Sequence, residues 1–292
     1  KTQSTGVELT INTKNIDSRN FKWSTDFTFT AYKDRWKERT PDWKPGVYER
    51  VDDPIRPIYT RLADHILQIG EQVPDAQPLL RPGELVIKDI NGYRRDANKQ
   101  PIVDENGRFV LTGEPDGLID DADNVLLGSQ DPSWLAGITN TFKYKDFDLN
   151  IQLNGMFGRR MQDPTEMAYG LGGGDLARYG YNALRKIKDR WTWDNPSTTQ
   201  PTSFNGWGNN YTSGDWYYQR AWFIRLTNIS FGWTLPKAWI ARTKVLSRVR
   251  LSLSANNLFC ITPYKGLDPE TDYYAASYPN ARTYSMGINV TF

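Results

Sequence analysis

The last nine residues of the chain, YSMGINVTF, alternate strictly between apolar and polar side chains. Apolar residues stand at Tyr284, Met286, Ile288, Val290 and Phe292, and the four residues between them are small or polar. A period of two predicts a β-strand with two different faces. The last strand of a soluble protein usually frays, so a strand that ends on an aromatic residue indicates a special environment for this end.

The same alternation recurs along the chain and predicts seven antiparallel strands. They cover residues 5–13, 21–32, 134–144, 148–159, 219–234, 247–258 and 282–292. Each strand has one apolar face rich in aromatic residues and one face with polar and charged residues. We assign Phe27, Leu149, Leu153 and Leu253 to the apolar faces.

The strand predicted at 219–234 is less regular than the others. Its apolar positions change phase between Leu226 and Ile229. This change predicts either a β-bulge near Thr227–Asn228 or an upper half of the strand that stands above a membrane.

The connections between the predicted strands are short at one end and long at the other. The short ones lie at about 13–20, 144–148 and 235–246, and the long ones at 33–133, 160–218 and 259–281. This difference is typical of outer-membrane β-barrels. The alternative is a soluble β-sandwich whose apolar faces pack together, but it would need loops longer than are usual in a compact domain.

Seven strands are too few for such a barrel. Bacterial single-chain barrels have an even number of strands, from eight upward, and an open sheet edge in lipid would leave backbone groups unpaired. We therefore expect residues 1–292 to be the C-terminal part of a larger barrel. The chain starts with Lys-Thr-Gln, without Met or a signal peptide, which suggests a cut or mature N-terminus. Phe292 is expected in the aromatic girdle at the periplasmic rim.

Composition excludes several classes of function. The 36 basic and 34 acidic residues give a net charge of +2, so no overall field attracts nucleic acid. One cysteine and one histidine exclude a disulfide framework and most His-dependent or zinc chemistry. No nucleophile elbow, phosphate loop or His–acid cluster occurs, so we expect no enzyme and no organic cofactor. The mean hydropathy of −0.65 would suggest a soluble protein, but barrel strands are only half apolar.

Four stretches of the chain carry a family resemblance. They are GSQDPSWLAGITNTFKYKDFDLNIQLNGMFG (128–158), RLTNISFGWTLPKAW (225–239), LSLSANNLFCITPYKGLDPE (251–270) and SYPNARTYSMGINVTF (277–292). Together, and in this order, they resemble the C-terminal half of the SusC-like TonB-dependent transporters of Bacteroidetes outer membranes. The resemblance implies an all-β fold, with this chain forming the last seven strands of a plugged barrel of about 22 strands. It also implies that 33–133 and 160–218 are extracellular loops.

The resemblance further implies partners and a cargo. A SusD-like lipoprotein would cap the outside, TonB would act through an N-terminal part that this chain lacks, and a dimer of transporter–cap pairs is allowed. The cargo would be a nutrient, an oligosaccharide or, alternatively, an oligopeptide. Two other interpretations remain open: a passive porin without a plug, and a surface β-rich carbohydrate-binding protein without transport.

An acidic segment between the second and third strands resembles a calcium loop. Asp116–Asp123 fits positions five to twelve of that pattern, with Gly117 at the turn. Asp89 and Asn91 would fit positions one and three if 92–115 form an inserted hairpin, and relatives with an unbroken motif are the reason for joining the halves. The expected ligands of a structural Ca²⁺ are Asp89, Asn91, Asp116, the carbonyl of Leu118 and Asp123. The alternative is an acidic surface loop held by Asx-turns.

The outer loops are rich in aromatic residues. Trp191, Trp193, Trp207, Tyr211 and Trp216 are the candidates for holding a cargo. Flat aromatic faces can cover the C–H surface of sugar rings, while polar neighbours bind the hydroxyl groups. As a group they favour a saccharide over a peptide. The alternative is that the rings pack the loops against one another or against the cap.

Two short helices are expected in the loops. One covers 55–69, with Tyr59, Leu62, Ile66 and Ile69 on one face and His65 at the surface, and the other covers 181–191.

Overall fold

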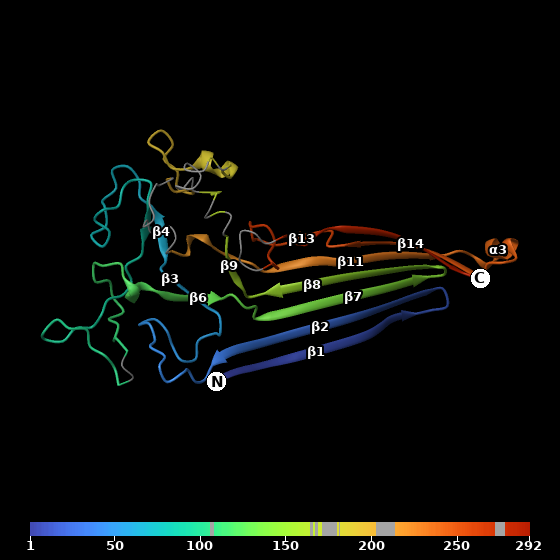
Figure 1. Ribbon diagram of the computed structural model, residues 1–292, viewed down its shortest axis with the longest axis horizontal. Helices are drawn as coiled ribbons and strands as arrows, with labels where there is room; N and C mark the ends of the chain where they lie inside the picture. Colours follow the sequence, from blue (N-terminus) through green and yellow to red (C-terminus); the bar gives the residue numbers. More distant parts are fainter. Residues whose placement is uncertain are drawn as a thin grey trace.

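The computed structural model of the chain describes residues 1–105, 108–163, 166, 169–170, 180, 182–202, 214–271 and 278–292. Its main feature is an antiparallel sheet whose long strands are neighbours in chain order (Figure 1). These strands are β1 (Thr2–Asp17), β2 (Phe21–Trp36), β7 (Trp134–Tyr144), β8 (Phe147–Phe157), β11 (Phe223–Thr234), β12 (Arg248–Asn256) and β14 (Thr283–Thr291). A two-residue strand, β13 (Cys260–Ile261), also pairs with β11.

The seven long strands confirm the seven predicted from alternation, with differences of a few residues at their ends. The largest difference is at 219–234, where the first residues form a separate strand, β10 (Tyr218–Arg220), which pairs with β9 (Arg160–Gln162) instead of joining the main sheet. The lengths of the connections also agree with the prediction. The short turns lie at one end of the sheet with the C-terminus, and the long loops gather at the other (Figure 1).

The apolar residues share one face of the sheet. Residues that are directly opposite in an antiparallel pair point to the same side. Across the sheet, the register joins Phe142, Leu149, Phe231, Leu253 and Met286 in one row of paired positions. Leu253 is 55% exposed and Met286 is 78% exposed, so nothing in the described chain covers this part of the face.

Aromatic rings line the same face. Trp134 stacks on Phe157 with ring centroids 3.7 Å apart, and Phe147 stacks on both Phe231 and Trp233 at 5.8 Å. Such pairs add specific ring contacts to the apolar surface without closing it from the surroundings.

The opposite face is polar. Thr28, Gly137 and Asn154 form one row there, and Asp148 lies opposite Gly232 in another. At position 232 a Cβ atom would lie 2.2 Å from the Arg250 guanidinium and 2.6 Å from the Asp148 carboxylate. Glycine therefore leaves room for the Arg250–Asp148 ion pair, 2.7 Å long, which crosses over β11.

The bulge predicted in β11 is confirmed. The pairing with β8 slips by one residue between Leu226 and Asn228, which leaves Thr227 without an opposite residue. The Thr227 hydroxyl instead donates to the carbonyl of Gln152 at 3.0 Å. The extra residue moves both Leu226 and Ile229 to the apolar face, which explains the change of phase in the sequence.

The loops form short strands and turns of their own. Two small sheets pair β3 (Pro57–Thr60) with β6 (Val125–Ser129) and β4 (Ala63–Ile66) with β5 (Leu85–Ile87). Short helical turns cover Asp121–Asp123, Arg185–Asp189, Asp215–Tyr217 and Ala241–Thr243, and a single α-helical turn, α3, covers Lys237–Ile240. No helix in the described ranges has the length and apolar character needed to span a membrane.

The helix predicted at 55–69 is wrong. The segment forms β3 and β4, in which Ile58, Thr60 and Ile66 are buried in contact with residues far away in the sequence. The apolar spacing fits a helix, but pairing with β6 and β5 supplies the backbone partners, so tertiary contacts override the local pattern. Within 182–191, the described part of the second predicted helix, only the five-residue 3₁₀ turn Arg185–Asp189 forms, and the backbone on both sides of it is extended.

Candidate functional site

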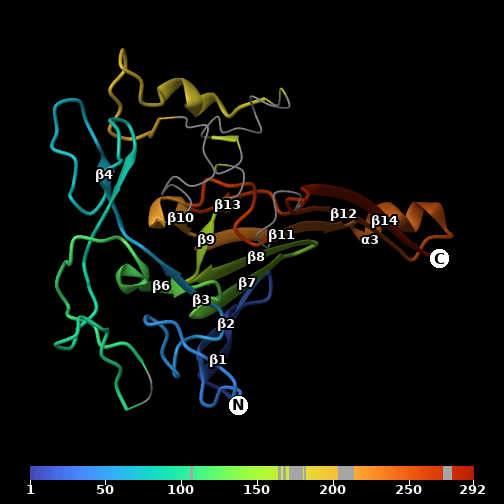
Figure 2. The same cartoon turned by 60° about the vertical axis from the view of Figure 1, so that its left-hand side comes forward.

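The loops build a compact cap above one end of the sheet. Figure 2 shows β3, β4 and β6 with the neighbouring loops gathered at that end. The centre of this loop cap is a cluster of fully buried apolar residues: Ile66, Leu85, Ile87, Trp191 and Tyr217. These residues come from β4 and β5 in the first long loop and from positions 191 and 217 in the second. The two long loops therefore hold each other in place.

The structure separates the candidate aromatic residues into different environments. Trp191 is 2% exposed, and its indole N–H donates to Gln68 Oε1 at 3.3 Å. Trp216 is partly buried against the same cluster. Both rings therefore fit the packing alternative. Trp193 is 67% exposed and contacts Trp191 edge to face at 5.3 Å, so its outer surface is open. Trp207 and Tyr211 lie outside the described residues.

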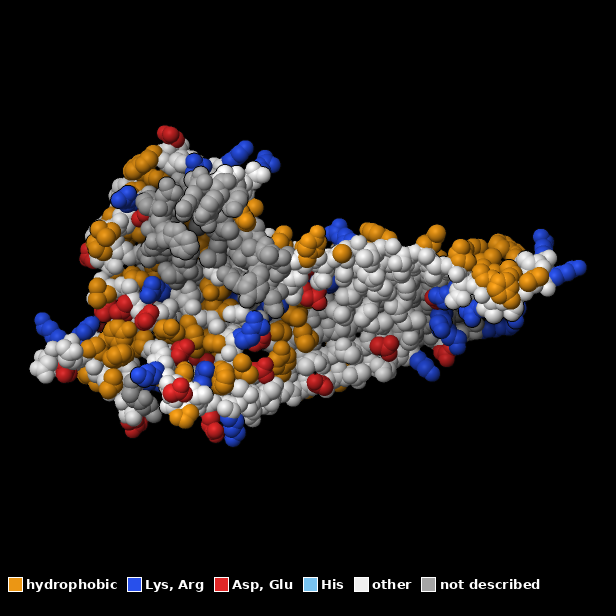
Figure 3. Space-filling model, in the orientation of Figure 1, with side chains coloured by type: hydrophobic (Ala, Val, Ile, Leu, Met, Phe, Trp, Pro, Cys, Tyr) orange, Lys and Arg blue, Asp and Glu red, His pale blue; other side chains and the backbone are white. Residues whose placement is uncertain are grey.

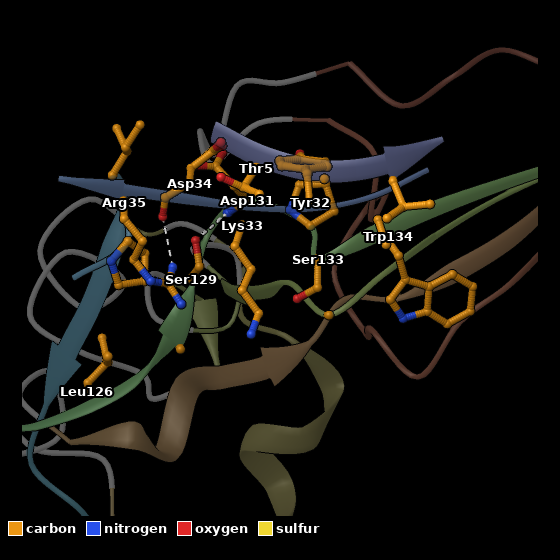
Figure 4. Close-up of a pocket in the computed structure, with 18 residues that line it drawn as sticks. Thr5, Tyr32, Lys33, Asp34, Arg35, Leu126, Ser129, Asp131, Ser133 and Trp134 are labelled. Atoms are coloured by element: carbon orange, nitrogen blue, oxygen red, sulfur yellow. Dashed lines mark hydrogen bonds between the residues drawn. The ribbon is translucent and has the colours of Figure 1, made fainter. Parts of the chain in front are cut away.

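A groove of about 700 Å³ lies between the loop end of the sheet and the loop cap. Figure 4 shows its walls, which come from the ends of β1 and β2, from β6 and from the segment that leads into β7. Its labelled lining residues are Thr5, Tyr32, Lys33, Asp34, Arg35, Leu126, Ser129, Asp131, Ser133 and Trp134. The lining thus combines two basic groups, two acidic groups, hydroxyl groups and two aromatic rings.

The charged groups of the groove are held in place to different degrees. Arg35 Nη1 donates to the backbone carbonyl of Asp34 at 2.8 Å, and Asp131 forms an ion pair of 3.2 Å with Arg56. Sequence reasoning did not find this groove. Its lining residues are separated by up to 153 positions, from Thr5 to Gly158, and no spacing in the sequence joins them.

A buried arginine ties together three of the stretches that carry the family resemblance. Arg225 of β11 is buried and forms ion pairs with Asp268 at 2.6 Å and with Glu270 at 3.0 Å. Asp268 also accepts the backbone N–H of Asn280 at 3.0 Å, and the Asn280 amide donates to Glu270 at 2.9 Å. We call these four residues the Arg225 clamp. A buried charge is tolerated only when it is paired and hydrogen-bonded, so the clamp fixes the loop after β13 to the end of β11.

The two halves of the acidic loop meet, as the inserted hairpin requires. The Asp89 carboxylate accepts the backbone N–H groups of Asp116 at 3.2 Å and Gly117 at 2.7 Å. Between them, Tyr93 bridges to Leu111 and Val103 to Phe109 in a hairpin. Gly117 has φ +85°, the left-handed region in which glycine is favoured.

The carboxylates of this loop already accept backbone donors. Asp123 is fully buried and accepts the N–H groups of Ile90, Asn91 and Asp120 at 2.8–3.2 Å. Asp116 accepts the N–H of Leu118 in an Asx-turn. In the described part of the chain, no three acidic, His or Cys side chains gather in a way that could hold a metal ion. The Ca²⁺ site of Asp89, Asn91, Asp116, Leu118 and Asp123 therefore stays a prediction.

His65 is partly exposed and lies between two acids. Its ring nitrogens lie 2.9 Å from Asp64 and 2.6 Å from Glu71, and Lys88 contacts Asp64 at 3.3 Å. Burial alone would lower the pKa of His65, but the hydrogen bonds and charges of the two acids outweigh it and raise the pKa above its ordinary value. The hydrogen bond between His65 and Asp64 also lowers the pKa of Asp64.

Known proteins are similar to this chain in sequence and in the arrangement of strands. No protein-family model matches the chain. The TonB-dependent receptor P3 of Formosa agariphila is 28% identical over 316 residues, which cover 99% of this chain. The TonB-dependent receptor SusC of Bacteroides thetaiotaomicron is 25% identical over 98% of this chain. Over nearly its whole length the chain is similar to SusC-like TonB-dependent receptors. It spans 29% of the length of the first relative and 26% of the second.

Solved structures of SusC-like receptors share the fold. The structure of the RagAB peptide transporter matches this chain over its whole length with a TM-score of 0.73 at 20% identity, and the chain covers 29% of that protein. The RagAB peptide importer in its closed-closed state gives a TM-score of 0.72 at 22% identity. The antiparallel sheet of this chain thus has the same fold as the corresponding part of these transporter structures.

Proposed function

We propose that this receptor segment forms part of the wall and the outer loops of an outer-membrane importer. The observation that carries the proposal is the sheet, whose aromatic and aliphatic face leaves large side chains such as Phe231, Leu253, Met286 and Ile288 exposed while its other face is polar. Soluble proteins rarely expose such a continuous apolar surface, and lipid is the solvent that this surface fits. The short turns would then face the periplasm and the loop cap would face the outside.

The proposed importer takes up a nutrient with energy from TonB, together with a SusD-like lipoprotein that closes over the loop cap. TonB would act through parts of the receptor beyond this chain. The role proposed for the described residues is to bind and guide the cargo rather than to catalyse a reaction. A structural Ca²⁺ at the acidic loop would pin the base of the first long loop, where the two halves of the motif already lie together.

The cargo proposed first is an oligosaccharide. Trp193 supports it. Its ring is held by edge-to-face contact with the buried Trp191, and its exposed surface can lie against a sugar ring. Trp207 and Tyr211 are further candidates from the sequence.

An oligopeptide is the second candidate. The groove favours it, because Lys33, Arg35, Asp34 and Asp131 could pair with charged side chains or termini of a peptide. RagAB, whose fold this chain shares, is a peptide transporter.

Uptake by cells with and without the gene tests the proposal. Cells should lose growth on the receptor's oligosaccharides when the gene is deleted and regain it with the intact gene. Loss of growth on peptides alone would select the second cargo. Release of the receptor from membranes by carbonate without detergent would contradict the outer-membrane importer itself.

A further inference from the structure

One of the three connections at the short-turn end is unusually long. Three residues join β1 to β2 and two residues join β7 to β8, whereas residues 235–247 join β11 to β12. We call residues 235–247 the basic turn. A hairpin needs only two to five residues to reverse direction, so most of this turn is not required by the sheet.

The basic turn is well ordered. It contains α3 and the 3₁₀ turn Ala241–Thr243, and the Thr243 hydroxyl donates to the Ile240 carbonyl at 2.7 Å. Within the turn, the Ile240 side chain is buried, and Ser247 N donates to the Thr291 carbonyl at 2.8 Å. A turn with these internal contacts can hold its side chains at a defined distance from the end of the sheet.

Trp239 extends the apolar face of the sheet onto this turn. It is 57% exposed and contacts Trp233 edge to face at 5.9 Å. Trp233 in turn stacks on Phe147. Exposed tryptophan at the end of an apolar band is typical of the boundary between hydrocarbon and lipid headgroups.

Basic groups surround this tryptophan. The turn contains Lys237, Arg242 and Lys244, all exposed, and no acidic residue. Among the described residues, none of the three has an ion-pair partner; the neighbouring Asp148 is already paired with Arg250. Figure 3 shows Lys and Arg side chains around an apolar cluster at this end of the molecule.

We infer that the basic turn binds the headgroups of anionic phospholipids in the membrane leaflet on the short-turn side. This inference rests on the proposed membrane location of the sheet. Trp239 inserts at the level of the headgroups, while Lys237, Arg242 and Lys244 contact their phosphates. Basic side chains next to an anionic lipid surface each strengthen the attraction by about fivefold, and arginine can bind a phosphate through two parallel hydrogen bonds.

Lipid titration of the purified full-length receptor tests the inference. The receptor in a mild detergent is titrated with phosphatidylglycerol and, separately, with zwitterionic phosphatidylcholine, and the bound lipids are counted by native mass spectrometry. We expect the wild type to bind phosphatidylglycerol at least about tenfold more tightly. Raising sodium chloride from about 0.05 M to about 0.5 M should reduce this preference.

The decisive variant combines Lys237→Gln, Arg242→Gln and Lys244→Gln. It should lose at least about tenfold in affinity for phosphatidylglycerol and bind phosphatidylcholine as before. The matched control combines Arg94→Gln, Arg95→Gln and Lys99→Gln, which removes three exposed charges from the loop hairpin instead. It should keep the preference of the wild type.

Two results would overturn the inference: a wild type that does not distinguish the two lipids, or a triple variant within about twofold of the wild type. Heat-modifiable migration on gels shows whether each variant is folded. A folded, detergent-dependent receptor without lipid preference contradicts the inference alone. A receptor that carbonate releases contradicts the proposed function as well.

Discussion

Leu253 and Met286 in the sheet are more than half exposed, whereas Ile66 and Leu85 in the loop cap are almost completely buried. Both regions contain the same types of apolar residue in antiparallel strands. The sheet leaves these side chains exposed, whereas the loop cap buries them. The cap behaves like a small water-soluble domain with its own core. The sheet keeps its apolar residues outward, as expected where lipid takes the place of water.

The comparison predicts its largest effect at Trp191. Trp191→Ala should destabilise the loop cap by about 3–5 kcal/mol, because it removes a large side chain from the buried cluster. Hydrogen exchange of the backbone amides at 63–87 measures this loss. Trp193→Ala is the control, since the exposed ring should change the stability of the cap by less than about 0.5 kcal/mol and should weaken cargo binding instead. Equal destabilisation by both variants would contradict the separation of the two rings.

The Arg225 clamp should be nearly as sensitive. Arg225→Met leaves Asp268 buried without its partner, and breaking a buried ion pair from one side costs about 3–5 kcal/mol. We expect faster proteolysis and hydrogen exchange in residues 259–271. The double variant Arg225→Met with Asp268→Leu should recover part of the loss, because no unpaired charge remains. Arg56→Met, which breaks the more exposed pair with Asp131, is the control and should have a much smaller effect.

The two faces of the sheet should respond differently to a charge. Leu253→Arg puts the charge on the apolar face and should cost about 2–4 kcal/mol near the middle of the membrane. Ser254→Arg, one residue further on the polar face, is expected to cost clearly less. Urea unfolding of both variants in lipid vesicles gives the comparison. A greater loss for Ser254→Arg would reverse the assignment of the faces.

The smallest effect is the dependence of the loop cap on pH. The pKa of His65 is raised in the folded protein, so its contribution is fully present below the ordinary value of 6.5 and is lost as the pH rises through the folded value. The lowered pKa of Asp64 acts in the opposite direction, and its contribution is lost as the pH falls below 3.8. The thermal midpoint of the cap should therefore fall slightly between about pH 6 and pH 8. His65→Asn should remove this slope, and an unchanged slope would assign it to other groups.

Much of the sheet could be predicted because its rule is local. Alternation with a period of two shows which residues share a face, and the change of phase in β11 predicts a bulge near Thr227–Asn228 as one of two explanations, which the register selects. The contrast between short and long connections indicates the two ends of the sheet. The strand order and the apolar face follow from these patterns, whereas the resemblance to SusC-like receptors rests on the four quoted stretches.

The loop cap could not be predicted in the same way. Tyr59, Leu62 and Ile66 have helical spacing, yet the segment becomes β3 and β4 because strands from 85–87 and 125–129 pair with it. Trp191 and Trp193 lie two positions apart in similar sequence surroundings. Contact with the 63–87 segment buries Trp191, and Trp193 stays exposed. The groove and the partners of Arg225 likewise depend on residues that are distant in the chain.

The sequence by itself determined the number and order of the long strands and their apolar face, and it limited the irregularity in β11 to the region of Thr227–Asn228. These features need only the period of the backbone and the polarity of each side chain. The tertiary structure alone decided which loop aromatics are buried, how the acidic halves meet and which carboxylates pair with Arg225. Those outcomes depend on contacts between residues that are distant in the chain, which no local spacing encodes. The sheet lowers the entropic cost of these contacts because it holds the ends of the loops close together.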